Sequence, residues 1–145
     1  MRTIYNIFIY FFVFACKIAS LFVPKVKTMI AGQKETIAKL DKLDKTKKTA
    51  WFHCASLGEF EQARSLIEEF KQNKPDYNIL VSFFSPSGYE IRKNYALADC
   101  VVYLPFDTKK NAKKFIKHAN PDIVFFVKYE FWYNYIIELQ NIPLY

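Results

Sequence analysis

The fold of this chain is decided by residues 50–74, which read AWFHCASLGEFEQARSLIEEFKQNK. Residues 50–55 form a short apolar run with aromatic side chains, which is typical of a buried strand. Residues 57–74 have the apolar spacing of an amphipathic helix. The expected apolar face of this helix consists of Phe60, Ala63, Leu66, Ile67 and Phe70. A strand followed by such a helix is the repeating unit of a parallel α/β sheet.

The same alternation continues to the last residue. Further strands are expected at residues 77–84, 100–104 and 122–127, and further helices at residues 86–97, 108–119 and 131–139. Near-continuous apolar strands favour a sheet that is covered on both faces, and right-handed crossovers then give a Rossmann-like layer. We therefore predict an α/β fold over residues 49–145, with a parallel sheet and helices on both faces. Residues 142–145 read as the start of a fifth strand, so we expect a fragment of a longer domain.

The positive charge of the chain lies at one end. The 145 residues include 21 Lys or Arg and 14 Asp or Glu, for a net charge of +7. Residues 1–48 carry 10 basic and 3 acidic side chains, whereas residues 49–145 carry 11 of each. A nucleic-acid-binding domain is expected to carry a basic patch on its folded part. The charge distribution therefore predicts no nucleic-acid partner and draws attention to the N-terminal segment.

Composition excludes two other classes of protein. Apolar residues make up 52% of the chain, which is too many for a disordered or low-complexity protein. Cys16, Cys54 and Cys100 are widely spaced and match neither a zinc site nor a disulfide framework. We expect reduced thiols, as in a cytosolic compartment, and no metal site.

Residues 1–24 are interpreted as an apolar membrane anchor. Residues 4–23 are just long enough to span a bilayer, and Lys17 can extend its amine to the interface. Basic residues follow the segment and only Arg2 precedes it, so the positive-inside rule places the rest of the chain on the cytoplasmic side. The anchor either spans the membrane or lies in its interface.

Two other interpretations of this segment stay open. Residues 13–16 read VFAC and resemble a lipoprotein cleavage box in which Cys16 is lipidated, although Phe14 fits that box poorly. The segment also has the composition of a buried core helix.

Residues 25–48 form a basic amphipathic segment and linker. Their apolar residues have mixed helical spacings, which predicts a helix along or near the membrane, and residues 41–48 read as a polar linker. Lysines close to a membrane attract anionic lipid by about 1 kcal/mol each. An anionic inner-membrane lipid is therefore an expected partner.

Polar residues gather in the loops that follow the predicted strands. In an open parallel sheet, ligands bind at the carboxyl ends of the strands. The four loops there are residues 53–59, 85–88, 105–107 and 128–134. Their candidate binding or catalytic residues are His53, Ser56, Gly58, Glu59, Ser85, Ser87, Gly88, Asp107, Glu130, Trp132 and Asn134. We expect these loops to line one polar crevice.

Several of these residues also have a purely structural interpretation. Ser56 and Glu59 have the spacing of a capping box, whereas the functional interpretation makes Glu59 a catalytic base beside Gly58, which lets a ligand approach. Ser85 and Asp107 read as helix N-caps. His53 and Trp132 have the alternative of a place in the core. These alternatives stay open at the level of the residues alone.

Taken together and in order, the four loops resemble the N-terminal half of the 3-deoxy-D-manno-octulosonic acid (Kdo) transferases of Gram-negative bacteria. The family pattern is approximately H-x-A-S-x-G-E, a T-x-T-x-T-G-like turn, L-P-x-D and E-x-W-P-N. The corresponding residues here read HCASLGE at 53–59, SFFSPSG at 82–88, LPFD at 104–107 and EFWYN at 130–134. Tyr133 replaces the usual proline, and Lys128 stands where many members have a second acidic residue.

The resemblance implies a two-domain (GT-B) glycosyltransferase at the cytoplasmic face of the bacterial inner membrane. This chain would be the half that binds the lipid A precursor (lipid IVA), while an absent C-terminal half binds the donor, CMP-Kdo. Glu59 would be the general base of an inverting transfer, with Ser56 and Gly58 shaping its loop. Glu130, Trp132 and Asn134 would line the acceptor side, together with the remaining loop residues. The resemblance implies no metal or other cofactor, and it implies that this fragment alone is inactive.

Two alternative functions follow from other features. If Cys16 is lipidated, the chain is a lipid-anchored binding module without catalytic activity. An orphan Rossmann-like nucleotide-binding domain is the other alternative, although the sequence has neither G-x-G-x-x-G nor a P-loop.

Overall fold

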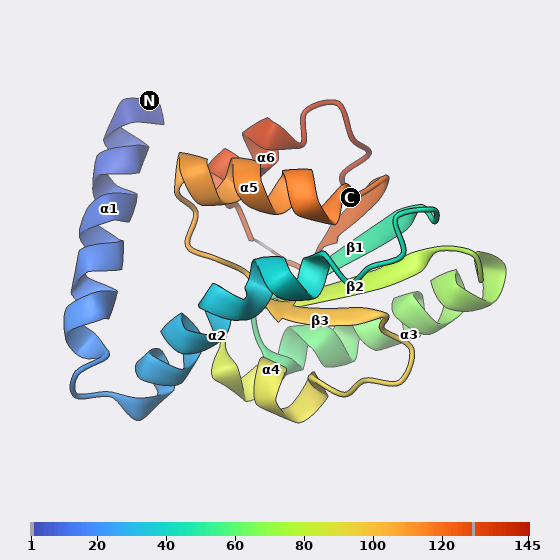
Figure 1. Cartoon of the computed structure of the whole chain (residues 1–145), viewed down its shortest axis with the longest axis horizontal. Coiled ribbons are helices and arrows are strands. Elements are labelled where there is room, and N and C mark those ends of the chain that lie inside the picture. The colour runs from blue at the N-terminus through green and yellow to red at the C-terminus, as the bar shows by residue number, and fades with distance from the viewer. Residues whose placement is uncertain (1, 129) are drawn as a thin grey trace.

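A parallel four-stranded sheet forms the centre of the structure, a computed structural model that describes residues 2–128 and 130–145 (Figure 1). The strands are β1 (Thr49–Cys54), β2 (Asn78–Phe83), β3 (Cys100–Tyr103) and β4 (Ile123–Phe126). They lie in the order β3-β2-β1-β4. The predicted Rossmann-like sheet is confirmed.

The direction in which strands are added reverses beside β1. The chain places β2 and β3 on one side of β1 and then returns to place β4 on the other. In open α/β sheets, such a reversal opens a crevice at the carboxyl ends of the two strands involved. The structure therefore puts the loops after β1 and β4 at the position where this fold binds ligands.

The last residues pair with the outer edge of β4. Leu144 forms a parallel bridge with Val124, and the amide of Val124 donates to the carbonyl of Pro143 over 2.9 Å. The amide of Phe126 donates to the carbonyl of Tyr145 over 2.8 Å. The expected start of a fifth strand is confirmed.

Six helices accompany the sheet in the described residues. They are α1 (Arg2–Ala19), α2 (Pro24–Leu40), α3 (Leu57–Asn73), α4 (Pro86–Arg92), α5 (Lys109–Ala119) and α6 (Tyr133–Glu138). Helices α3 and α4 lie on one face of the sheet, with α5 and α6 on the other (Figure 1). Successive side chains of β1 point to opposite faces of the sheet. Phe52 belongs to the cluster under α3, whereas Trp51 packs under α5 and α6.

Two helices are shorter than the sequence pattern predicts. Helix α4 ends at Arg92 rather than at residue 97, because single-turn hydrogen bonds from Tyr95 to Arg92 and from Ala98 to Tyr95 turn the chain back toward β3. Helix α6 begins at Tyr133, since the backbone of Trp132 is still extended. On α3, Phe60, Ala63 and Ile67 are buried as expected, whereas Leu66 is 42% exposed.

Helix α2 differs from the expectation of a basic segment beside the membrane. It packs against the edge strand β3, with Thr36 donating to the carbonyl of Tyr103 over 2.8 Å and Gln33 donating to that of Leu104 over 3.0 Å. A Cβ on Gly32 would lie 2.3 Å from the Tyr103 ring, so glycine allows this close approach. The expected linker also contributes to the core, because Leu43 is buried. These contacts make α2 part of the α/β fold.

Helix α1 lies at the end of the sheet where the loops gather. Its 18 residues are long and apolar enough to cross a bilayer, and only 6% of them are buried. Within the part of the chain that the structure describes, α1 is therefore largely exposed and not a core helix. One side of α1 nevertheless touches the rest of the protein, because Phe12, Val13 and Cys16 pack against the core cluster under α3.

Candidate functional site

The loops after β1 and β4 lie side by side at the switch point of the sheet. The amide of Val127, just after β4, donates to the carbonyl of His53 over 3.0 Å. The amide of Ser85, just after β2, donates to the carbonyl of Ala55 over 2.8 Å. The loops after β1, β2 and β4 therefore meet at one edge of the sheet. Tyr129, in the last of these loops, lies outside the described residues.

Glu59 lies at the open N-terminus of α3. Ser56 precedes the helix, and its backbone amide donates to Glu59 Oε2 over 3.0 Å, so the Glu59 half of the expected capping box is present. This bond fixes one carboxylate oxygen and leaves the other without a role in the cap. Gly58 is exposed, and a Cβ built on it would meet nothing within 4 Å. The chain itself gives no packing reason for glycine at this position.

The second loop divides into a polar part and a packing part. Ser85 caps α4, with its Oγ 3.2 Å from the amide of Ser87 and 2.8 Å from the Ser87 hydroxyl. Gly88, in contrast, is buried, and a Cβ there would lie 2.3 Å from the ring of Phe83. Ser85 and Ser87 can therefore present oxygens beside the loop that leads to Glu59. Gly88 serves the contact between α4 and β2, which explains its small size without a ligand.

His53 is a buried link in a chain of hydrogen bonds across the sheet. Parallel pairing sets it opposite Ser82, and its Nδ1 is 2.8 Å from the Ser82 hydroxyl. Trp51 Nε1 donates to the same hydroxyl oxygen over 2.7 Å. On the other side of the imidazole, Trp132 Nε1 donates to His53 Nε2 over 3.1 Å.

His53 Nε2 faces two groups with opposite preferences. The Trp132 indole is only a donor and pairs with an unprotonated Nε2, whereas the Glu130 carboxylate is an acceptor and pairs with a protonated Nε2. His53 is completely buried, so it positions Trp132 and does not face a ligand directly.

Glu130 lies beside the same imidazole. Its Oε2 is 3.7 Å from His53 Nε2, within ion-pair range of a protonated ring but too far for a hydrogen bond. His53 and the Trp132 indole hold the pKa of Glu130 below its usual range, although burial opposes them. Glu130 is consequently ionised near neutral pH.

Two carboxylates act on the thiol at the end of β1. Burial is the largest cause of a raised pKa of the Cys54 thiol, and the charges of Glu59 and Glu130 raise it further. Both carboxylates therefore act on Cys54, which is the last residue of β1. The buried thiol stays protonated and serves packing, and both carboxylates are close enough to the end of β1 to act on it.

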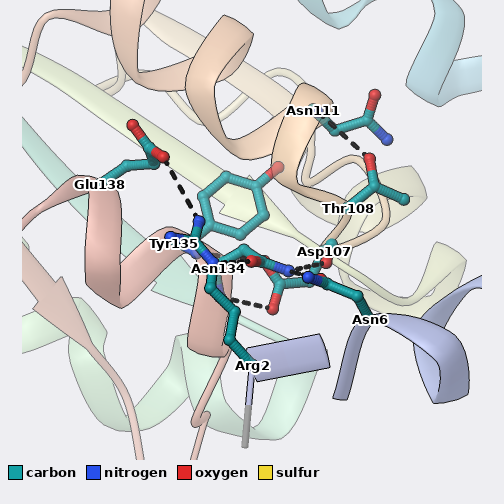
Figure 2. Close-up of polar contacts among 8 residues, drawn as sticks. All are labelled: Arg2, Asn6, Asp107, Thr108, Asn111, Asn134, Tyr135 and Glu138. Carbon is teal, nitrogen blue, oxygen red and sulfur yellow. Dashed lines mark hydrogen bonds and ion pairs between the residues drawn. The ribbon is translucent and has the colours of Figure 1, made fainter. Parts of the chain in front are cut away.

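Asp107 and Asn134 bind α1 (Figure 2). Asp107 Oδ2 accepts from the Tyr5 hydroxyl over 2.6 Å, and Asn134 Nδ2 donates to Asn6 Oδ1 over 2.9 Å. Arg2 Nε donates to Asn134 Oδ1 over 3.3 Å. A further ion pair of 3.7 Å joins the Arg2 guanidinium to Glu138. We call these six residues the α1 clamp: Arg2, Tyr5, Asn6, Asp107, Asn134 and Glu138.

The expectation that Asp107 caps the helix after it is wrong. Thr108 caps α5 by accepting from the amide of Asn111 over 3.2 Å. Asp107 instead caps α6, because its Oδ2 and Oδ1 accept from the amides of Asn134 and Tyr135 over 3.0 and 3.1 Å. Burial raises the pKa of Asp107 despite these hydrogen bonds. Asp107 and Asn134 are buried and fully engaged within the protein, so they do not line the crevice as expected.

Sequence reasoning missed Ser82 and the α1 residues of the clamp. Ser82 is a lone hydroxyl between Val81 and Phe83, on the strand face that it shares with Leu80. A polar residue on the buried face of a predicted strand is a signal that could have found it. Tyr5 and Asn6 are polar residues in an apolar helix, but their partners lie more than 100 positions away along the chain.

Lys128 follows β4 with an unusual backbone. Its φ is 62°, in the left-handed region that side chains other than glycine rarely occupy. Such backbone strain persists where surrounding contacts impose it, often at functional sites. The backbone is thus constrained at the start of the loop that carries Glu130.

Comparison with known proteins identifies similar sequences. A family model described as 3-deoxy-D-manno-octulosonic-acid transferase (kdotransferase) matches residues 31–145. The 3-deoxy-D-manno-octulosonic acid transferase of Aquifex aeolicus is 33% identical over 98 residues, which are 67% of this chain and 27% of that protein. The transferase of the same name from Haemophilus influenzae is 33% identical over 97 residues, covering 64% and 22% of the two chains.

A bifunctional glycosyltransferase/methyltransferase of Fusobacterium nucleatum is also similar, at 32% identity over 100 residues. The match covers 67% of this chain and 16% of that protein. The matched region thus spans between 16% and 27% of these curated relatives.

Proposed function

This chain belongs to the 3-deoxy-D-manno-octulosonic acid (Kdo) transferase family, and on that premise we propose that the complete protein transfers Kdo from CMP-Kdo to the lipid A precursor, lipid IVA. The transfer would belong to the assembly of the lipopolysaccharide inner core. The present chain would supply the acceptor-binding half of a two-domain glycosyltransferase. The observation that carries the proposal is the position of Glu59, at the open N-terminus of α3 beside the switch point of the sheet.

Glu59 is proposed as the general base. A carboxylate within reach of the acceptor hydroxyl can take its proton in the transition state. The amide of Ser56 holds Oε2, so Oε1 is the oxygen proposed to take the proton of the acceptor hydroxyl. The hydroxyl oxygen then attacks the anomeric carbon of Kdo from the face opposite the departing CMP, which inverts the configuration at that carbon.

The other loop residues are proposed to bind the acceptor. Ser85 and Ser87 offer hydroxyl groups beside the Glu59 loop, and exposed Gly58 leaves room for the acceptor to approach. Glu130 is proposed to accept a hydrogen bond from a sugar hydroxyl, because it is an ionised acceptor held by His53 and Trp132. The proposed reaction needs no metal or other cofactor.

The donor is proposed to bind mainly to residues outside this chain. The matched region covers about a quarter of two Kdo transferases, so most of such a protein lies beyond the present 145 residues. We propose that this chain alone does not turn over CMP-Kdo. We also propose that it works at the cytoplasmic face of the bacterial inner membrane, since α1 is long and apolar enough for membrane attachment.

The test is Glu59→Gln in the complete protein. The glutamine oxygen still accepts from the Ser56 amide, so the cap and the fold are retained. Glutamine does not accept the proton, and loss of a general base is expected to lower the rate of Kdo transfer to lipid IVA by about 100-fold or more. Glu69→Gln is the matched control, because Glu69 is exposed on the same helix. Near-normal transfer by Glu59→Gln would leave Glu59 with only its capping role.

A further inference from the structure

An apolar groove separates α1 from the loop that carries Glu130. Its volume is about 350 Å³. One wall includes Phe8, Ile9 and Phe12 of α1, and the other includes Glu130, Phe131 and Trp132. We call it the α1 groove. Tyr5 also lines the groove, but its hydroxyl is bound to Asp107, so apart from Glu130 and the Trp132 indole nitrogen the walls are mainly carbon.

The wall that α1 provides is held in place at more than one point. The α1 clamp fixes the first two turns of the helix through Tyr5 and Asn6. The ring of Phe12, two turns further along, lies 5.9 Å from that of Phe106 in an edge-to-face contact. Ile9, between these points, is buried. Helix α1 is therefore positioned by the domain and is more than a tether.

The groove continues into the outward surface of α1. Phe8 lines the groove and is also 62% exposed. It belongs to a stripe of exposed apolar residues at helical spacing: Ile4, Ile7, Phe8, Phe11, Phe14 and Ile18. Leaving such a surface in water costs about 25 cal/mol per Å². A bilayer surface removes that cost, and its acyl chains then lie at the mouth of the groove.

The polar end of the groove determines the rest of the occupant. Glu130 is ionised and its side chain is 20% exposed, so it presents an acceptor without a donor. An occupant that fits both ends has an alkyl chain for the carbon-lined walls and a hydroxyl-bearing head for Glu130.

We propose that the α1 groove binds one acyl chain of an amphiphile whose hydroxylated head reaches Glu130. Helix α1 is then one wall of a binding site as well as a membrane attachment. The identity of this amphiphile as the lipid acceptor rests on the proposed function, whereas the presence of the site does not. If the protein acted on another lipid, the identification of the amphiphile as the acceptor would fall, and the binding site itself would remain.

Tryptophan fluorescence tests the groove without measuring transfer. The chain has two tryptophans, of which Trp132 lines the groove and Trp51 is buried in the core. The probe is an alkyl maltoside with bromine at the end of its chain, used as a monomer below its micelle concentration. Bromine quenches indole fluorescence at short range, so we expect saturable quenching of the Trp132 emission. Trp132→Phe should abolish the quenching.

Two phenylalanines of α1 form a matched pair for this assay. Phe8→Ser removes part of the α1 wall of the groove, and we expect about tenfold weaker binding of the probe. Phe11→Ser removes a 70% exposed ring from the outward stripe, and we expect it to bind the probe as the parent chain does. Both side chains are largely exposed, so neither substitution is expected to unfold the protein.

Three results would overturn the proposal. They are absence of quenching in the parent chain, quenching that persists in Trp132→Phe, and equal loss of binding in the two phenylalanine variants. The last would place the alkyl chain on the outward stripe. Because the assay contains no CMP-Kdo, its outcome is independent of the Glu59→Gln experiment. Failure of one does not imply failure of the other.

Discussion

Gly58 and Gly88 lie early in α3 and α4, and the structure gives them opposite roles. Gly58 faces open space, so nothing within the chain requires its lack of a side chain. Gly88 faces Phe83 and the amide of Leu57 at distances that a Cβ does not tolerate. At the scale of the residue, one glycine is a candidate for ligand approach and the other is a packing residue.

Alanine at each position separates these roles. Gly58→Ala is expected to stabilise the fold by up to about 1 kcal/mol, because alanine favours a helix, and to lower acceptor binding. Gly88→Ala is expected to cost about 1–3 kcal/mol through overpacking against Phe83. Urea unfolding measures the stability of both variants, and KM for lipid IVA in the complete protein measures acceptor binding. An unchanged KM in Gly58→Ala would remove the case for ligand approach at that position.

Glu130 also has a role that is defined at the scale of the residue. His53 favours its ionised form, so the pKa of Glu130 is lower in the folded protein than in the unfolded chain. A lowered carboxyl pKa means that the unfolded state binds more protons in the intervening range of pH. Stability therefore rises with pH across that range. The contribution of Glu130 to the stability of the fold is fully present above the pKa that this residue has in the unfolded chain. It is lost as the pH falls through the pKa that it has in the folded protein.

Glu130→Gln should remove this contribution. We expect the variant to be less stable than the parent chain near neutral pH, with the difference shrinking below about pH 4. Urea unfolding at several pH values measures the difference, and Glu69→Gln serves as the exposed control. A difference that does not change with pH would mean that packing, and not ionisation, explains the effect.

At the scale of the element, polar contacts add to apolar packing in positioning α1 and α2. Helix α2 places Thr36 and Gln33 on carbonyl groups at the end of β3. Helix α1 is held by the α1 clamp, with Asp107 serving both α1 and the N-terminus of α6. One buried carboxylate thus couples the apolar helix to the loop that precedes α6.

Tyr5→Phe tests that coupling by deleting one hydroxyl. A hydrogen bond to a charged group contributes about 2 kcal/mol, and Asp107 would lose one of its donors. We expect faster amide hydrogen exchange in α1 and little change in the central sheet. Tyr10→Phe removes a hydroxyl from the exposed side of the same helix and should leave exchange unchanged. Equal exchange in the two variants would show that apolar contacts alone hold α1.

At the scale of the whole molecule, the charge is concentrated beside α1. The first 48 residues carry the entire net charge of +7, and the remainder of the chain is neutral. Lys17, Lys25 and Lys27 are exposed at the end of α1 and the start of α2. Each lysine near an anionic surface contributes about 1 kcal/mol, which salt screens. The basic end thus complements the apolar stripe as a membrane-facing surface.

Vesicle binding tests this distribution of charge. We expect the chain with Lys25→Gln and Lys27→Gln to bind vesicles containing phosphatidylglycerol about tenfold or more weakly than the parent chain at low salt, and the difference to shrink at high salt. Lys47→Gln with Lys74→Gln is the control, because it removes the same charge near the amino ends of the strands. Equal losses in the two double variants would mean that net charge, and not its position, governs binding.

Much of the fold follows from periodicity in the sequence. The apolar runs at β1 to β4 and the helical spacing of residues such as Phe60, Ala63 and Ile67 predict the alternating elements, because these patterns reflect one buried face each. The family motifs also locate Glu59 and Glu130 in loops at the same edge. The end of α4 and the start of α6 were less well predicted, since turns and tertiary contacts decide where a helix stops.

The sequence by itself determined the α/β class, the polar loops that follow the strands, and the apolar, basic N-terminus. The tertiary structure alone decided the partners of the polar residues. Asp107 and Asn134 turned out to hold α1, His53 to hold Trp132, and residues 24–40 to pack on β3. The physical reason is that local periodicity reports only whether a face is buried. Which donor meets which acceptor depends on residues that folding brings together from distant parts of the chain.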